Sequence, residues 1–108
     1  MFGRRSSRFR DVIERQLALF AEDEADLLQE ADAAEAAWNA VGRDEAEEAY
    51  GDYQLVVDAI ADRLLDIRET YASTLDDAAA ADYRDAFGRA ARRRFRRYTS
   101  LLDDLDDA

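Results

Sequence analysis

The chain contains no cysteine, histidine, proline or lysine among its 108 residues, so all 15 basic residues are arginine. The missing cysteine excludes disulfides and thiolate nucleophiles, and the missing histidine excludes a Ser-His-Asp triad and the commonest metal ligand. The missing lysine excludes Schiff-base catalysis and the lysine of a phosphate-binding P-loop. We therefore expect a protein that is not an enzyme and has no metal or other cofactor, and we infer no small-molecule substrate.

The overall composition is typical of a folded and strongly acidic domain. Apolar residues make up 48% of the chain and charged residues 38%, with a formal net charge of -11. No apolar run approaches the roughly 20 residues that cross a bilayer, and the first ten residues lack the apolar segment of a signal peptide. We therefore expect a cytoplasmic protein. Its high content of alanine, aspartate and arginine is typical of proteins from either a high-GC bacterium or a salt-adapted archaeon.

Apolar residues recur at alternating steps of four and three along most of the chain, which is the periodicity of an amphipathic helix in a coiled-coil-like bundle. The pattern predicts helices over about residues 8–41, 45–72 and 75–105. Linkers this short require consecutive helices to pack antiparallel. The predicted fold is all-α, an antiparallel three-helix bundle of long amphipathic helices in one domain, residues 8–108. Residues 1–7 are expected to form a flexible basic arm.

Turn signals set the predicted helix boundaries. Gly42 follows the first apolar stripe, as expected of a helix C-terminus, and Asp44 with Glu47 has the form of a capping box for the second helix. Ser73 and Thr74, each with an aspartate three residues later, predict the start of the third helix. The apolar stripes that these signals delimit contain Ile13, Leu17, Phe20, Leu27, Ala31, Ala34, Trp38 and Val41; Ala46, Tyr50, Tyr53, Val57, Ile60, Leu64, Ile67 and Tyr71; and Tyr83, Phe87, Ala91, Phe95, Tyr98, Leu102 and Leu105.

Glu24 interrupts the first stripe, where an isolated ionised carboxylate is costly to bury and therefore needs a partner. Counting back from the two predicted turns places it level with Arg63 and Arg84. The sequence predicts an ion pair between Glu24 and Arg84, shared with Arg63. We favour a buried pair that fixes the helix register over a carboxylate tuned for function.

Arginines concentrate on the third helix, on the face opposite its apolar stripe. This basic ridge consists of Arg89, Arg92, Arg93, Arg96 and Arg97. Two uses of the ridge stay open. Acids on the first helix lie at the same predicted level and can neutralise it, or its guanidinium groups bind the phosphates of an anionic partner. An acidic face of a neighbouring copy is a further partner for the ridge. The acids of the first helix concerned are Asp26, Glu30, Asp32 and Glu35.

A second apolar edge lies beside the main stripes. It comprises Val12, Leu19, Leu28, Val56, Leu65 and Leu101. This edge either broadens the core of a monomer or faces a second copy, and we favour homodimerisation. The predicted function is therefore that of a non-enzymatic helical interaction or assembly protein that associates with itself or with another helical protein. The alternative is a binder of nucleic acid or an acidic membrane surface through the basic ridge; the net negative charge disfavours it.

Overall fold

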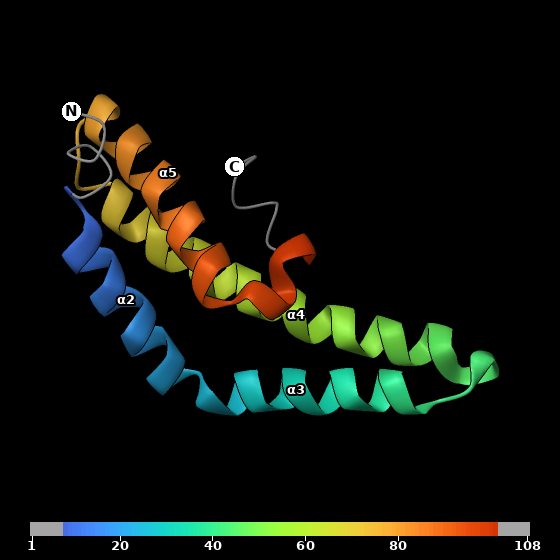
Figure 1. Ribbon diagram of the computed structural model, residues 1–108. Helices are drawn as coiled ribbons and strands as arrows, with labels where there is room; N and C mark the ends of the chain where they lie inside the picture. The colour runs from blue at the N-terminus through green and yellow to red at the C-terminus, as the bar shows by residue number, and fades with distance from the viewer. Residues whose placement is uncertain (1–7, 102–108) are drawn as a thin grey trace.

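The longest helix, α4 (Arg43–Ala72), is the element on which the others pack. One helix lies against the first half of α4 and another lies against its second half. The computed structural model describes residues 8–101. Its other elements are α2 (Arg10–Asp23), α3 (Ala25–Ala40), α5 (Asp77–Arg94) and a short 3-10 helix, η1 (Arg96–Leu101). Helix α3 runs back along the first half of α4, and α5 runs back along its second half (Figure 1).

The all-helical prediction is confirmed, but the described residues form four α-helices where three were expected. The first predicted helix is divided at Glu24 into α2 and α3. The third ends at Arg94, because Phe95 leaves the helical conformation with φ -113° and ψ 48°. The predicted arm at residues 1–7 and the predicted final turn, with Leu102 and Leu105, lie outside the described residues.

The bend at Glu24 changes which helices meet. Glu24 has φ -110° and ψ 30°, yet its N–H still donates to the Phe20 carbonyl at 2.8 Å. Its carbonyl accepts the Leu28 N–H at 3.0 Å, so backbone hydrogen bonds continue on both sides of the bend. The bend directs α2 away from the line of α3 and onto α5 (Figure 1). There Phe9 meets Tyr83 edge to face, with ring centroids 5.5 Å apart.

The core lies where α2, α5 and the second half of α4 converge. Its largest fully buried side chains are Tyr83, Phe87, Ile60, Leu64 and Val57, all of them on the predicted stripes. Tyr83 satisfies its hydroxyl by donating to Gln16 Oε1 at 2.8 Å. Burial raises the pKa of Tyr83 to about 12, because the phenolate would lie in an apolar surrounding.

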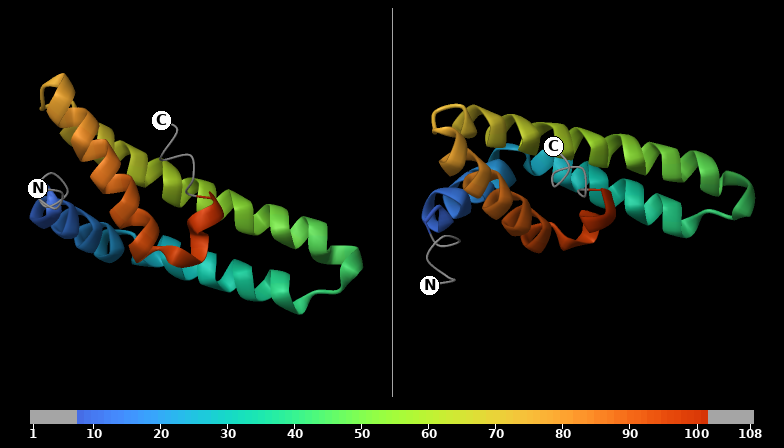
Figure 2. Two further views of the ribbon diagram at one scale, coloured as in Figure 1. Left: turned by 45° about the horizontal axis from the view of Figure 1, so that its top comes forward. Right: turned by 90° about the horizontal axis from the view of Figure 1, so that it is seen from above.

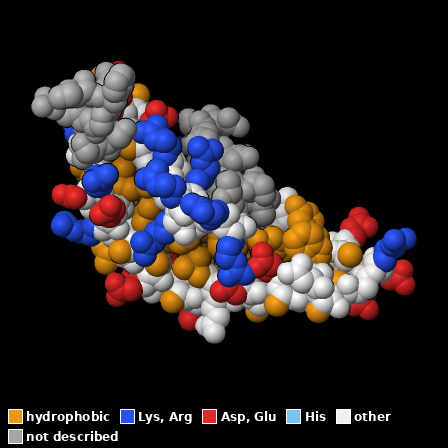
Figure 3. Space-filling model, in the orientation of Figure 1, with side chains coloured by type: hydrophobic (Ala, Val, Ile, Leu, Met, Phe, Trp, Pro, Cys, Tyr) orange, Lys and Arg blue, Asp and Glu red, His pale blue; other side chains and the backbone are white. Residues whose placement is uncertain are grey.

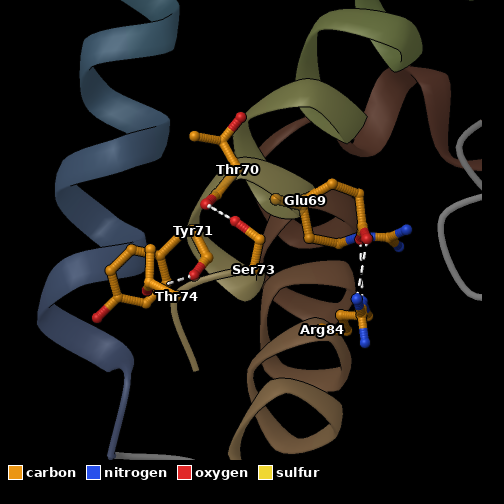
Figure 4. Close-up of polar contacts among 7 residues, drawn as sticks. Glu69, Thr70, Tyr71, Ser73, Thr74 and Arg84 are labelled. Carbon is orange, nitrogen blue, oxygen red and sulfur yellow. Dashed lines mark hydrogen bonds and ion pairs between the residues drawn. The ribbon is translucent and has the colours of Figure 1, made fainter. Parts of the chain in front are cut away.

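The two interhelical turns use different residues from those predicted. Helix α4 begins at Arg43 with Gly42 as N-cap and without a side-chain cap, so the expected capping box at Asp44 is wrong. Ser73 and Thr74 do not start α5; their hydroxyls donate to carbonyls in the last turn of α4, at 2.8 and 2.7 Å (Figure 4). The cap of α5 is Asp76, which accepts the Ala79 N–H at 2.8 Å.

The molecule is elongated, with principal extents of 51 × 25 × 23 Å. Its Cα radius of gyration of 15.6 Å exceeds the roughly 13 Å expected of a compact chain of this length. The excess comes from the end where α3 and α4 project beyond α5 as a two-helix hairpin (Figure 2). We call residues 32–52, which contain the end of α3, the turn and the start of α4, the hairpin arm.

Candidate interaction surfaces

Glu24 lies in an open groove beside the bend. Its carboxylate pairs with Arg63 Nε at 3.0 Å, and the two side chains are 30% and 49% exposed, respectively. The groove has a volume of about 530 Å³ and is lined by Gln16, Leu19, Phe20, Asp23, Glu24, Arg63, Asp66 and Ile67. The predicted contact with Arg63 is therefore present, but the prediction of a buried pair is wrong, because the bend turns this position out of the core.

Arg84 is not a partner of Glu24. It pairs instead with Glu69, since α5 folds back on α4 in a register that places these two residues at one level. Arg63 lies six residues before Glu69, which is nearly two helical turns. Because α5 runs antiparallel to α4, the part of α5 that lies level with Arg63 comes well after Arg84 in the sequence. The error in the prediction was one of register across the second turn.

Glu69 of α4 pairs with two arginines, Arg68 of its own helix and Arg84 of α5. Arg84 donates to both of its carboxylate oxygens at 2.9 Å, in a bidentate arrangement (Figure 4). Arg68 Nε donates to the same carboxylate at 2.7 Å, although the Arg68 side chain is only 2% exposed. The hydrogen bond from Arg84, together with Arg68, lowers the pKa of Glu69 to about 2.

Sequence reasoning missed Arg68, although a signal was available. Arg68 stands four residues from both Leu64 and Ala72, which are buried, so helical spacing places it on the core side of α4. A buried guanidinium requires hydrogen-bond partners, and the neighbouring Glu69 supplies one. This cluster holds α4 to α5 and is a structural element of the fold.

The basic ridge is split by the end of α5. Beyond Phe95 the chain turns toward α3, where Arg97 Nη1 pairs with Asp32 at 2.8 Å and Nη2 pairs with Glu35. The Tyr98 hydroxyl also donates to Asp32, at 3.0 Å. Acids of the predicted first helix therefore neutralise this arginine, and both carboxylates raise its pKa, with the Glu35 hydrogen bond as the largest cause.

The other four ridge arginines surround a shallow hollow at the end of α5. Arg89, Arg92, Arg93 and Arg96 line it, and its volume is about 350 Å³. Arg89 pairs with Asp85 of its own helix at 3.3 Å, and its side chain remains 44% exposed. Figure 3 shows the blue basic side chains gathered over α5 on this face. We call this feature the arginine hollow.

The hairpin arm carries aromatic residues without a packed core. Trp38 lies 4.8 Å from the Tyr50 ring and stacks on Tyr53 at 5.7 Å, measured between centroids. Tyr53 is buried because Tyr98 reaches it from η1, with 6.4 Å between their rings. Toward the tip, no residue among the described positions 32–52 is buried, although the predicted apolar stripes continue to Val41 and Ala46.

The second apolar edge serves mainly the core. Val12, Leu28, Val56 and Leu65 are half-buried against it, whereas Leu19 is 51% exposed at the groove. This result favours the prediction that a broad apolar stripe is used internally along α2 and the second half of α4. Of the large hydrophobic residues that are exposed among the described positions, Tyr50 lies on the hairpin arm, and Leu19 and Leu55 lie outside it.

Within residues 8–101, no group of three or more acidic side chains is placed to hold a metal ion. No helix among them combines the length and apolar character needed to cross a membrane.

Comparison of the chain with protein-family models, curated proteins and solved structures finds no match. Its function must therefore be argued from its own surfaces.

Proposed function

We propose that this chain is a non-enzymatic assembly protein that forms a homodimer through its hairpin arm. The observation that carries the proposal is the absence of any buried residue among described positions 32–52, a segment that nevertheless continues the apolar pattern of the core. Trp38 and Tyr50 lie together there, and Tyr50 is 37% exposed. A helical hairpin with one open apolar face is half of a four-helix bundle.

A second copy is the occupant that fits this surface best. Two arms related by a two-fold axis present the same aromatic residues to each other, which is the self-complementary arrangement of an isologous dimer. Burial of the tryptophan and tyrosine rings would supply the apolar area that the arm lacks in one copy. The arm is also thin, since α5 ends before reaching it, so a second hairpin has room to approach (Figure 2).

The test is the mass of the purified protein, measured by size-exclusion chromatography with light scattering. We expect twice the 12.3 kDa of one chain. Tyr50→Glu should give the mass of one chain, because the new carboxylate would be desolvated at the interface. A wild-type protein that remains monomeric at every salt concentration would contradict the proposal.

Leu55→Glu is the matched control. Leu55 is 69% exposed and lies on α4, two residues from Tyr53 and therefore on roughly the opposite side of that helix. It adds the same charge as Tyr50→Glu but should leave the dimer intact. If both variants dissociate the protein equally, added charge rather than the aromatic face controls association, and the proposed interface is wrong.

A further inference from the structure

The arginine hollow combines an open shape with a lining of a single chemical kind. All residues that line it in the described part of the chain are arginines, at the helical spacing 89, 92, 93 and 96. Three come from the last turns of α5, and Arg96 follows the break at Phe95. The break is fixed because Phe95 is buried and packs edge to face on Phe20 at 5.5 Å.

This anchoring separates two roles within the basic ridge. Arg97 turns to α3 and pairs with Asp32 and Glu35, and Arg96 lines the hollow together with the arginines of α5. Arg93 and Arg96 are exposed, and Arg89 keeps nearly half of its side chain in solvent. The negative end of the α5 dipole stabilises cations in the last turn of the helix, where Arg92, Arg93 and Arg94 lie.

Guanidinium groups that converge on a hollow match the oxygens of phosphate groups. Each guanidinium offers a planar fork of N–H donors, which binds phosphate through charge-assisted hydrogen bonds. The volume of about 350 Å³ is at the lower end of the range for small-molecule sites. No aromatic side chain is among its described lining residues, so the hollow lacks the aromatic platforms on which successive nucleic-acid bases stack in single-strand binding proteins.

The charge of the whole chain discriminates between small and extended anions. With a net charge of -11, a long polyanion that extends past the hollow meets repulsive acidic surface. A small anion inside the hollow lies within a few ångströms of the arginines, and salt screens the more distant acids, since the Debye length is about 8 Å at physiological ionic strength. We propose that the arginine hollow binds the phosphate groups of a small di- or triphosphate ligand.

The test is isothermal titration of the full chain with inorganic triphosphate in a phosphate-free buffer of about 0.15 M ionic strength, at which the distant acids are screened. We expect saturable binding, weakened by roughly tenfold or more in the double variant Arg93→Gln/Arg96→Gln, because charge-assisted hydrogen bonds are lost. Both positions are exposed, so the variant should keep its fold, which circular dichroism checks. Arg89→Gln provides a second variant in the same hollow.

Arg43→Gln is the control, because Arg43 begins α4 at the tip of the hairpin arm, away from the hollow, and its loss changes the net charge in the same direction. Equal weakening by the control would overturn the proposal in favour of non-specific attraction, and so would no binding by the wild type. Tighter binding of a 20-nucleotide single strand than of triphosphate, lost in the double variant, would overturn it in favour of a nucleic-acid site. The double variant should keep the mass of the wild type, which separates this proposal from dimerisation.

Discussion

Arg84 of α5 holds Glu69 of α4 through two hydrogen bonds of 2.9 Å, and the same carboxylate accepts a third from the buried Arg68. This arrangement makes Glu69 the link between an exposed ion pair and a guanidinium inside the fold. The two arginines have different environments, with exposed side-chain fractions of 39% for Arg84 and 2% for Arg68. Removing the carboxylate therefore differs in effect from removing its exposed partner.

We expect Glu69→Gln to destabilise the protein by about 1.5 kcal/mol and to lower Tm by roughly 7 °C, because it weakens hydrogen bonds to two charged groups. This value is discounted for the exposure of the Glu69 side chain. Arg84→Gln should cause a smaller loss, since Arg68 keeps its contact with Glu69. Urea unfolding of both variants measures the difference. An Arg84→Gln variant less stable than Glu69→Gln would contradict this account of the cluster.

The pKa of Glu69 leads to a prediction about acid stability. The folded-state pKa is lowered to about 2 from 4.5, with the Arg84 hydrogen bond as the main cause. A lowered pKa means that the stabilisation is fully present above pH 4.5 and is lost as the pH falls from about 4.5 to about 2. The wild type should lose its stability advantage over Glu69→Gln across this window. Parallel unfolding curves for the two proteins from pH 5 to pH 2 would show that Glu69 does not contribute.

Periodicity predicted most of the core correctly because burial depends on which side of a helix a residue occupies. Ile60, Leu64, Tyr83 and Phe87 followed from spacing alone and are buried. The pair of Glu24 with Arg84 did not follow, because ion-pair partners depend on the relative register of two helices, and an error of a few residues at a turn exchanges one partner for another. Arg84 therefore pairs with Glu69 instead of Glu24, whereas the predicted contact between Glu24 and Arg63 is present.

The bend at Glu24 was not predicted, since neither proline nor glycine marks it. Its one sign in the sequence was the acid within the apolar stripe, which was interpreted as a buried charge. The structure shows the cheaper solution, in which the helix bends and the carboxylate remains 30% exposed. The early end of α5 has no comparable sign, because residues 92–94 are good helix formers and the break follows from packing of Phe95 on Phe20.

The proposed dimer should strengthen with salt. The hairpin arm carries seven acids and one arginine, and two of the acids, Asp32 and Glu35, pair with Arg97. Two such arms repel each other, and the repulsion is screened as the Debye length falls from about 10 Å at 0.1 M salt to about 3 Å at 1 M. Sedimentation across this range should show a rising dimer fraction, whereas triphosphate binding at the arginine hollow should weaken. A dimer that dissociates at high salt would instead indicate an interface formed by opposite charges.

Gly51 offers a direct route to a more stable protein. It lies inside α4, and a Cβ added there meets nothing within 4 Å. Gly51→Ala should therefore raise the free energy of unfolding by about 0.5–1 kcal/mol, because alanine loses less backbone freedom in a helix and introduces no clash.

Gly42 is the contrasting position for the same substitution. It too has open space around an added Cβ, but it is the N-cap of α4, with φ -79° and ψ 177°. Alanine is a poor N-cap, so Gly42→Ala should not stabilise the protein, whereas Gly42→Ser should, because its hydroxyl can accept a free N–H of the first turn. Thermal unfolding of the three variants separates helix propensity from capping. If Gly51→Ala and Gly42→Ala raise Tm equally, the stabilisation comes only from the lower conformational entropy of the unfolded chain. The position of Gly51 inside a helix would then not be its cause.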